Sequence, residues 1–171
     1  LHCLCDIDAI DMDVHLAIRR QRQMFIEVSY TGGGVANAIT GIAGSSQWFN
    51  RGFVTYANQA KHDMLNVPEA LLNGQGAVSE AVVRAMVTGA ALAAEADYAV
   101  ATSGIAGPGG GTETKPVGTV WFAWLSPAGI SSKEHRFIGD RTSVREQAVK
   151  ISIEELLHKV TECNTVQPYS Y

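Results

Sequence analysis

The chain has 171 residues, of which 46% are hydrophobic and 18% charged, and this composition suits one α/β domain with a substantial core. Its formal net charge is −4 and its lysines and arginines are scattered, so we expect no general affinity for nucleic acid or for an anionic membrane. No apolar run approaches the roughly 20 residues that a membrane-spanning helix needs, and no secretory signal is recognisable, so we expect a cytoplasmic protein.

In the first half of the chain, predicted helices and strands alternate. Apolar residues at helical spacing predict a helix over residues 7–22, and a short strand follows over 24–30. Three consecutive glycines, Gly32 to Gly34, then lead into a helix over 35–43. A strand that runs through a glycine turn into a helix start is a geometry that binds anions. The pattern continues with a strand over 52–56 and a short helix over 57–65.

The second half predicts a helical turn over 68–73 and a long helix over 80–94, with Ser79 as its N-cap. Strands follow over 98–101, 119–125 and 133–138, and a turn at Pro127 to Gly129 makes the last two an antiparallel hairpin. A final helix is expected over 143–160, with a weakly ordered tail over 161–171. The predicted fold is therefore a three-layer α/β/α sandwich whose mixed sheet includes a late antiparallel hairpin.

A glycine-rich stretch, Ala101 to Val117, joins two of these predicted strands. Glycines let backbone amides approach a ligand closely, and Ser103, Thr112 and Lys115 add hydroxyls and a cation that suit a phosphate or a carboxylate. The alternative is a long connection without a ligand. Loops of this length are usually either functional or disordered, so length leaves both interpretations open.

Candidate catalytic groups lie where predicted strands end. Ser29 precedes the glycine turn, where backbone amides could stabilise an oxyanion formed by attack of its hydroxyl. Tyr56 and Lys61 span a junction from strand to helix, and burial there could lower the pKa of the lysine enough for it to activate a hydroxyl. The plainer alternatives are a serine bonded to the backbone and a solvated surface lysine.

Other polar groups are candidate ligands for an anion. Ser45 and Ser46 follow a turn of small residues and could bind phosphate, or could simply cap a helix. Arg141 precedes the last helix and could bind phosphate there, or could pair with Asp140. The five histidines show no spacing of four residues that favours a metal site, and we expect neither metal nor cofactor.

From about Val28 onward the chain carries a series of short motifs in a fixed order. They are Ser29, Thr31-Gly32-Gly33, Ala43-Gly44-Ser45-Ser46, Trp48-Phe49, Gly52-Phe-Val-Thr-Tyr56, Asn58, Ala60-Lys61, Gly76-Ala-Val-Ser79-Glu80, Ser103-Gly104-Ile-Ala106-Gly107-Pro108, Gly110-Gly111, Lys115-Pro-Val-Gly118-Thr-Val-Trp121, Gly139-Asp140-Arg141 and Val144-Arg145. With these motifs the chain closely resembles the CinA C-terminal domain family of nicotinamide-nucleotide amidases. So many motifs in one order make a chance match very improbable.

The resemblance implies hydrolysis of the carboxamide of nicotinamide mononucleotide, which yields nicotinate mononucleotide and ammonia in pyridine-nucleotide salvage. It implies that Ser29 is the nucleophile, that Lys61 is its activating base and that Tyr56 assists. The substrate-binding residues it implies are Thr31, Gly32, Gly33, Ser45, Ser46, Ser103, Gly104, Ala106, Gly107 and Arg141.

The chain departs from the family beside the expected nucleophile. The family usually reads Glu-Ser-Cys-Thr-Gly-Gly where this chain has Val28, Ser29, Tyr30 and then Thr31 to Gly33. An alternative function is therefore a catalytically silent homologue that binds the nucleotide without turnover. We expect a single domain over 1–171, with a divergent N-terminal helix and strand over 1–27, that forms a homo-oligomer.

Overall fold

The structure is a computed structural model that describes residues 24–27 and 30–165. The helix predicted over 7–22, and residues 28 and 29 of the first predicted strand, lie outside this part of the chain. In chain order the elements are β1 (Met24–Glu27), α2 (Gly34–Thr40), η1 (Ser45–Gln47), β2 (Phe49–Phe53), α3 (Asn58–Leu65), α4 (Glu69–Gln75), α5 (Glu80–Ala94), β3 (Tyr98–Gly104), β4 (Thr119–Ser126), β5 (Gly129–Arg136) and α6 (Arg141–Thr165).

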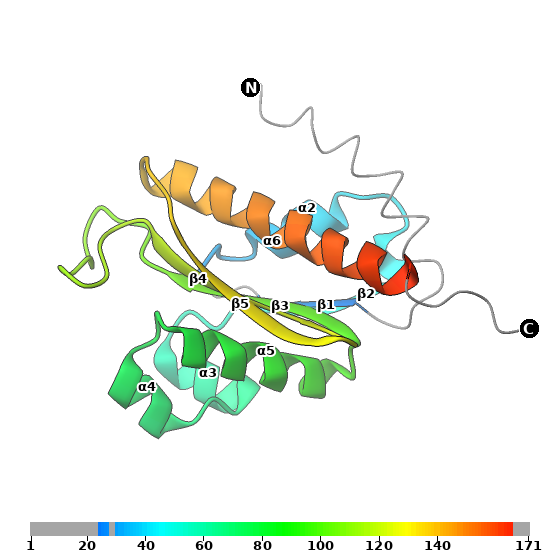
Figure 1. Cartoon of the computed structure of the whole chain (residues 1–171), viewed down its shortest axis with the longest axis horizontal. Coiled ribbons are helices and arrows are strands. Elements are labelled where there is room, and N and C mark those ends of the chain that lie inside the picture. The colour runs from blue at the N-terminus through cyan, green and yellow to red at the C-terminus, as the bar shows by residue number, and fades with distance from the viewer. Residues whose placement is uncertain (1–23, 28–29, 166–171) are drawn as a thin grey trace, which may run out of the picture.

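The described strands form one mixed sheet in the order β2-β1-β3-β4-β5. β1 pairs in parallel with β2 and β3, whereas β3, β4 and β5 pair antiparallel. Helices α2 and α6 cover one face of the sheet, and α3, α4 and α5 cover the other (Figure 1). The predicted three-layer sandwich with its late hairpin is confirmed.

Strand β3 presents large residues to one face of the sheet and small residues to the other. Tyr98 and Val100 join the core beneath α2 and α6, whereas Ala99 and Ala101 face α5. In β4, Phe122 lies on the α6 side and Ala123 on the α5 side, because successive side chains of a strand point to opposite faces. The alanine-rich α5 can therefore lie close against the sheet.

A glycine in α5, Gly89, allows α3 to approach α5 closely. A Cβ on Gly89 would overlap the carbonyl oxygen of Leu65, the last residue of α3. Leu65 is almost wholly buried in the core on this face of the sheet. The absence of a side chain at Gly89 thus sets where the C-terminal end of α3 packs.

Several element boundaries differ from the sequence prediction: α2 ends at Thr40 rather than at residue 43, and α6 begins at Arg141 rather than at residue 143. β2 begins three residues earlier than expected and ends at Phe53, because its parallel pairing with β1 fixes its limits. β5 begins at Gly129 rather than at residue 133, because Ser126 and Gly129 already pair across the turn. β3 runs on to Gly104, so the connection to β4 covers residues 105–118.

Two further predictions were wrong in detail. Ser79 occupies the N-cap position of α5 as expected, but its side chain makes no capping hydrogen bond, because its hydroxyl donates a hydrogen bond of 2.9 Å to the carbonyl of Gly76 instead. Residues 161–165 continue α6 rather than forming a weakly ordered tail. Among the described helices, none is both long enough and apolar enough to cross a bilayer.

An aromatic cluster joins β5 to the core. The ring of His135 stacks on Phe137 with centroids 5.6 Å apart and planes 7° apart, and it meets Phe122 edge-on. Burial lowers the pKa of His135, and the nearby Lys133 lowers it further, whereas Glu155 acts in the opposite direction. The folded protein therefore favours the neutral imidazole.

We predict that Gly89→Ala destabilises the protein by about 1 to 3 kcal/mol, because the added methyl group forces α3 away from α5. The matched control is Gly74→Ala in α4, where an added Cβ meets nothing within 4 Å. That change should be neutral or stabilise the helix by roughly 0.5 to 1 kcal/mol. Urea unfolding of both variants measures the difference, and equal stabilities would contradict this account of the packing.

We also predict that His135 makes the protein sensitive to acid. The unfolded chain binds a proton near pH 6.5, whereas the folded chain resists it to lower pH, so the free energy of unfolding falls as the pH drops below 6.5. His135→Phe keeps an aromatic ring in the stack but cannot titrate. Urea unfolding over a pH series should show a smaller acid loss in this variant than in the wild type; an unchanged loss would assign the effect to other groups.

Candidate active site

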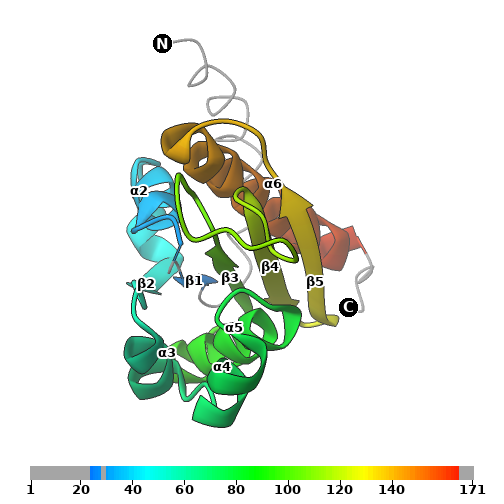
Figure 2. The same cartoon turned by 90° about the vertical axis from the view of Figure 1, so that its left-hand side faces the viewer.

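The candidate site is a cavity of about 150 Å³ near the carboxyl ends of β1, β2 and β3. Parallel strands end at the same edge of a sheet, and connections that follow such ends commonly hold ligands. Figure 2 looks onto this end of the molecule, where the glycine-rich connection lies between α6 above and α4 and α5 below. The cavity is lined by Tyr30, Tyr56, Asn58, Lys61, Ala77, Val78, Ser103, Gly104, Ala106 and Arg141.

Lys61 is a buried base candidate on α3. Only 3% of the residue is exposed, and its Nζ donates a hydrogen bond of 2.8 Å to the carbonyl of Thr55. A second, longer contact of 3.5 Å reaches the carbonyl of Tyr56. Lys61 lies one helical turn before Leu65, so the face of α3 that packs into the core also carries the amine. The expected alternative of a solvated surface lysine is wrong.

Ser103 supplies a hydroxyl to the same cavity from the end of β3. The residue is 4% exposed, and its backbone is held by antiparallel pairing opposite Trp121 of β4. Ser103 is one of the residues that line the cavity, so its hydroxyl is well placed to contact a bound molecule.

Arg141 connects the two sides of the cavity mouth. As the first residue of α6, it donates a hydrogen bond of 3.2 Å to the carbonyl of Gly107 and one of 3.4 Å to the hydroxyl of Tyr56. Asp140 does not pair with it, and instead accepts a hydrogen bond from the backbone amide of Ser143. Asp140 therefore caps α6, and Arg141 faces the cavity with its guanidinium near the glycine-rich connection.

Tyr30 forms the wall that follows β1. The residue is only 8% exposed, and its hydroxyl has no hydrogen-bond partner in the part of the chain that is described. Burial raises the pKa of Tyr30 to about 12, although Arg141 and Arg145 both oppose the shift. Tyr30 is thus a neutral side chain at every physiological pH.

The structure brings together some of the predicted site residues. Tyr56, Lys61, Ser103, Gly104, Ala106 and Arg141 all line the cavity, and Gly107 contacts Arg141. Ser29 lies outside the described residues. Thr31, Gly32 and Gly33 follow Tyr30 directly but do not line the cavity; the Thr31 carbonyl accepts a hydrogen bond of 2.6 Å from Arg145.

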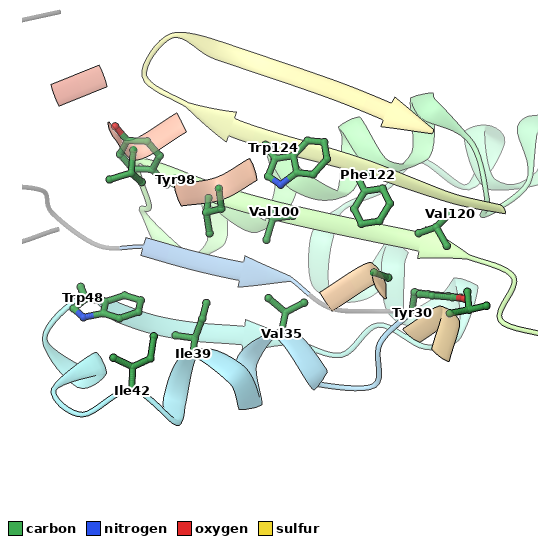
Figure 3. Close-up of a cluster of buried hydrophobic side chains, with 14 of the residues drawn as sticks. Tyr30, Val35, Ile39, Ile42, Trp48, Tyr98, Val100, Val120, Phe122 and Trp124 are labelled. Carbon is green, nitrogen blue, oxygen red and sulfur yellow. The ribbon is translucent and has the colours of Figure 1, made fainter. Parts of the chain in front are cut away.

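Ser45 and Ser46 are not brought to this cavity. They lie in η1, which precedes β2, whereas the cavity is near the end at which β2 finishes. Figure 3 shows the separation: Trp48, directly after η1, lies at one end of the buried cluster and Tyr30 lies at the other. The two serines are predicted as substrate ligands because they belong to a matching motif, but a motif does not show at which end of the strands its residues lie.

Four cavity residues were not predicted as site residues: Tyr30, Asn58, Ala77 and Val78. Three of them stood within the quoted motifs, Asn58 in the segment before Lys61 and the other two before Ser79. The matching motifs therefore included these three residues, but their residue types did not indicate a catalytic or binding role. In the described part of the chain, no cluster of three or more histidines, cysteines or carboxylates could hold a metal ion.

Comparison with known proteins agrees with this architecture. The family model of the CinA C-terminal domain matches residues 9–160, which extends the resemblance further toward the N-terminus than the quoted motifs did. The nicotinamide-nucleotide amidohydrolase PncC of Pseudomonas putida is 50% identical over 144 residues, which are 84% of this chain and 90% of that one. PncC of Escherichia coli K12 is 57% identical over 129 residues, 75% of this chain and 78% of the other.

A solved structure supports the same relationship. The crystal structure of the competence/damage inducible protein CihA from Agrobacterium tumefaciens superposes with a TM-score of 0.85 at 40% sequence identity. The alignment covers 90% of this chain and 94% of that one. Sequence motifs and fold therefore agree, and the chain belongs to the CinA C-terminal domain family.

Proposed function

We propose that this chain is an amidohydrolase that converts nicotinamide mononucleotide to nicotinate mononucleotide and ammonia. The observation that carries the proposal is the buried amine of Lys61 in a cavity that also holds the hydroxyl of Ser103 and the guanidinium of Arg141. The relatives named nicotinamide-nucleotide amidohydrolase PncC support the choice of substrate, since they are 50% to 57% identical to this chain.

In the proposed reaction, Ser29 attacks the carboxamide carbon and Lys61, as a neutral amine, accepts the hydroxyl proton. The carbonyls of Thr55 and Tyr56 accept hydrogen bonds from Nζ of Lys61. These bonds hold the amine at the cavity, and a general base must be held within reach of the proton that it accepts.

The tetrahedral intermediate then collapses. The C–N bond breaks, and the departing nitrogen takes the proton held by Lys61 and leaves as ammonia. Water attacks the resulting ester of Ser29 with Lys61 again as base, which releases the carboxylate product and restores the serine. The backbone amides of Gly32 and Gly33, which follow Ser29 closely in the chain, are the proposed donors to the oxyanion in both halves of the reaction, although neither glycine is among the residues that line the cavity.

The phosphate of the nucleotide is assigned to the side of the cavity where Arg141 lies. Arg141 carries a permanent positive charge and lies beside the carbonyl of Gly107, so a phosphate there would meet both the guanidinium and the amides of the glycine-rich connection. Tyr56, 70% exposed and in contact with Arg141, lies at the mouth of the cavity. The homo-oligomeric assembly and the cytoplasmic location stay predictions from the sequence.

We predict that the purified chain releases ammonia from nicotinamide mononucleotide and that Lys61→Met lowers the rate by about 100-fold to 10,000-fold, because the general base is lost. Ser29→Ala should abolish turnover. The matched control is Lys150→Met, which removes a lysine whose side chain is 53% exposed on α6. An enzyme-coupled ammonia assay measures all four proteins, and circular dichroism verifies that each is folded.

Equal ammonia release by the wild type and the Ser29→Ala variant would overturn the proposal. Calorimetry then separates the remaining possibilities. Binding of nicotinamide mononucleotide without turnover would favour the catalytically silent homologue that Val28 and Tyr30 suggest.

A further inference from the structure

The cavity has polar groups on some of its walls and apolar groups on others. Lys61, Asn58 and Arg141 have nitrogen-containing side chains, whereas Ala77, Val78 and Ala106 have aliphatic ones. Most of the lining surface is polar, so the cavity suits a largely polar ligand that has one small apolar part. A nucleotide that carries an aromatic carboxamide has this character.

Tyr30 is the one aromatic residue in the cavity wall that is also part of the buried core. It belongs to the cluster beneath α2 and α6, with Val35 and Val120 (Figure 3). Its ring carbon Cε2 lies so close to Gly104 that a Cβ there would be only 3.1 Å away. The missing side chain at Gly104 therefore makes room for the ring, and core packing holds the ring in place.

The hydroxyl of Tyr30 is not the part that a ligand would meet. Its oxygen is inaccessible to solvent and has no hydrogen-bond partner in the described chain. Gly104, beside which the ring carbon Cε2 lies, lines the cavity together with Tyr30. A ligand in the cavity thus contacts Tyr30 through atoms other than the hydroxyl oxygen.

We propose that the ring of Tyr30 is a specificity-determining wall: it packs against the aromatic ring of the substrate and limits the cavity to an unsubstituted pyridine carboxamide. This inference rests on the proposed function, because it concerns the substrate named there. A cysteine at this position, which the family pattern has, would leave the space of the ring open. The chain should therefore discriminate more strongly against substrates with a substituted pyridine ring than a variant that carries cysteine at this position.

The test measures binding in a Ser29→Ala background, where the substrate is not consumed. Calorimetry gives two Kd values, one for nicotinamide mononucleotide and one for an analogue with a methyl group on the pyridine ring. Both are measured for three proteins: the one with Tyr30 unchanged, Tyr30→Phe and Tyr30→Cys. Tyr30→Phe keeps the ring and should change both values less than about twofold. Tyr30→Cys should weaken binding of the nucleotide about tenfold and improve the relative binding of the methylated analogue by a similar factor.

Tighter binding of the nucleotide by Tyr30→Cys would overturn the inference, because the ring would then be an obstruction. An equal loss in Tyr30→Phe and Tyr30→Cys would also overturn it, since the hydroxyl would be responsible. Absence of nucleotide binding in the Ser29→Ala background would do the same. If the nucleotide binds but the protein with Ser29 intact releases no ammonia, only the proposed function fails, and the ratio of the two Kd values still decides the role of Tyr30.

Discussion

The close contact between α5 and α3 controls the position of the proposed base. Because Gly89 has no side chain, the carbonyl of Leu65 can lie against α5, and this contact fixes α3 against α5. Lys61 is one turn earlier on the same buried face, so its amine is carried into the cavity by a packing interaction that involves no catalytic group. The hydrogen bond from Nζ to the Thr55 carbonyl then sets the direction of the amine.

The cavity lies where the two helical layers meet beyond the sheet edge. Tyr30 and Arg141 belong to the side of α2 and α6, whereas Lys61, Ala77 and Val78 belong to the side of α3 to α5. Arg141 contacts Tyr56 and the connection between β3 and β4. Lys115 joins that connection to the carbonyl of Gln75 at 2.8 Å, so the same loop is tied to both layers. The glycine-rich segment is therefore a structural bridge as well as a candidate phosphate wall.

Periodicity predicted the elements well where they are long. The helix over 80–94 has the bounds of α5, and the alternation of large and small residues in β3 follows from the strand pattern. Short elements were less predictable: β2 contains Gly52 and Arg51, and its limits come from pairing with β1. The hydrogen bond of Ser79 was not predictable either. Serine is a residue type that commonly caps a helix through its side chain, but here the hydroxyl bonds to the carbonyl of Gly76.

The sequence by itself determined the family, the layered α/β fold and the identity of most cavity residues, since ordered motifs and periodicity are local properties of the chain. Tertiary structure decided which of those residues share a cavity. It separated Ser45 and Ser46 from Lys61, because the two serines precede β2 and the lysine follows it, so they lie at opposite ends of that strand. It also buried Lys61 and Tyr30, which depends on contacts from α5 and α6 that no local pattern records.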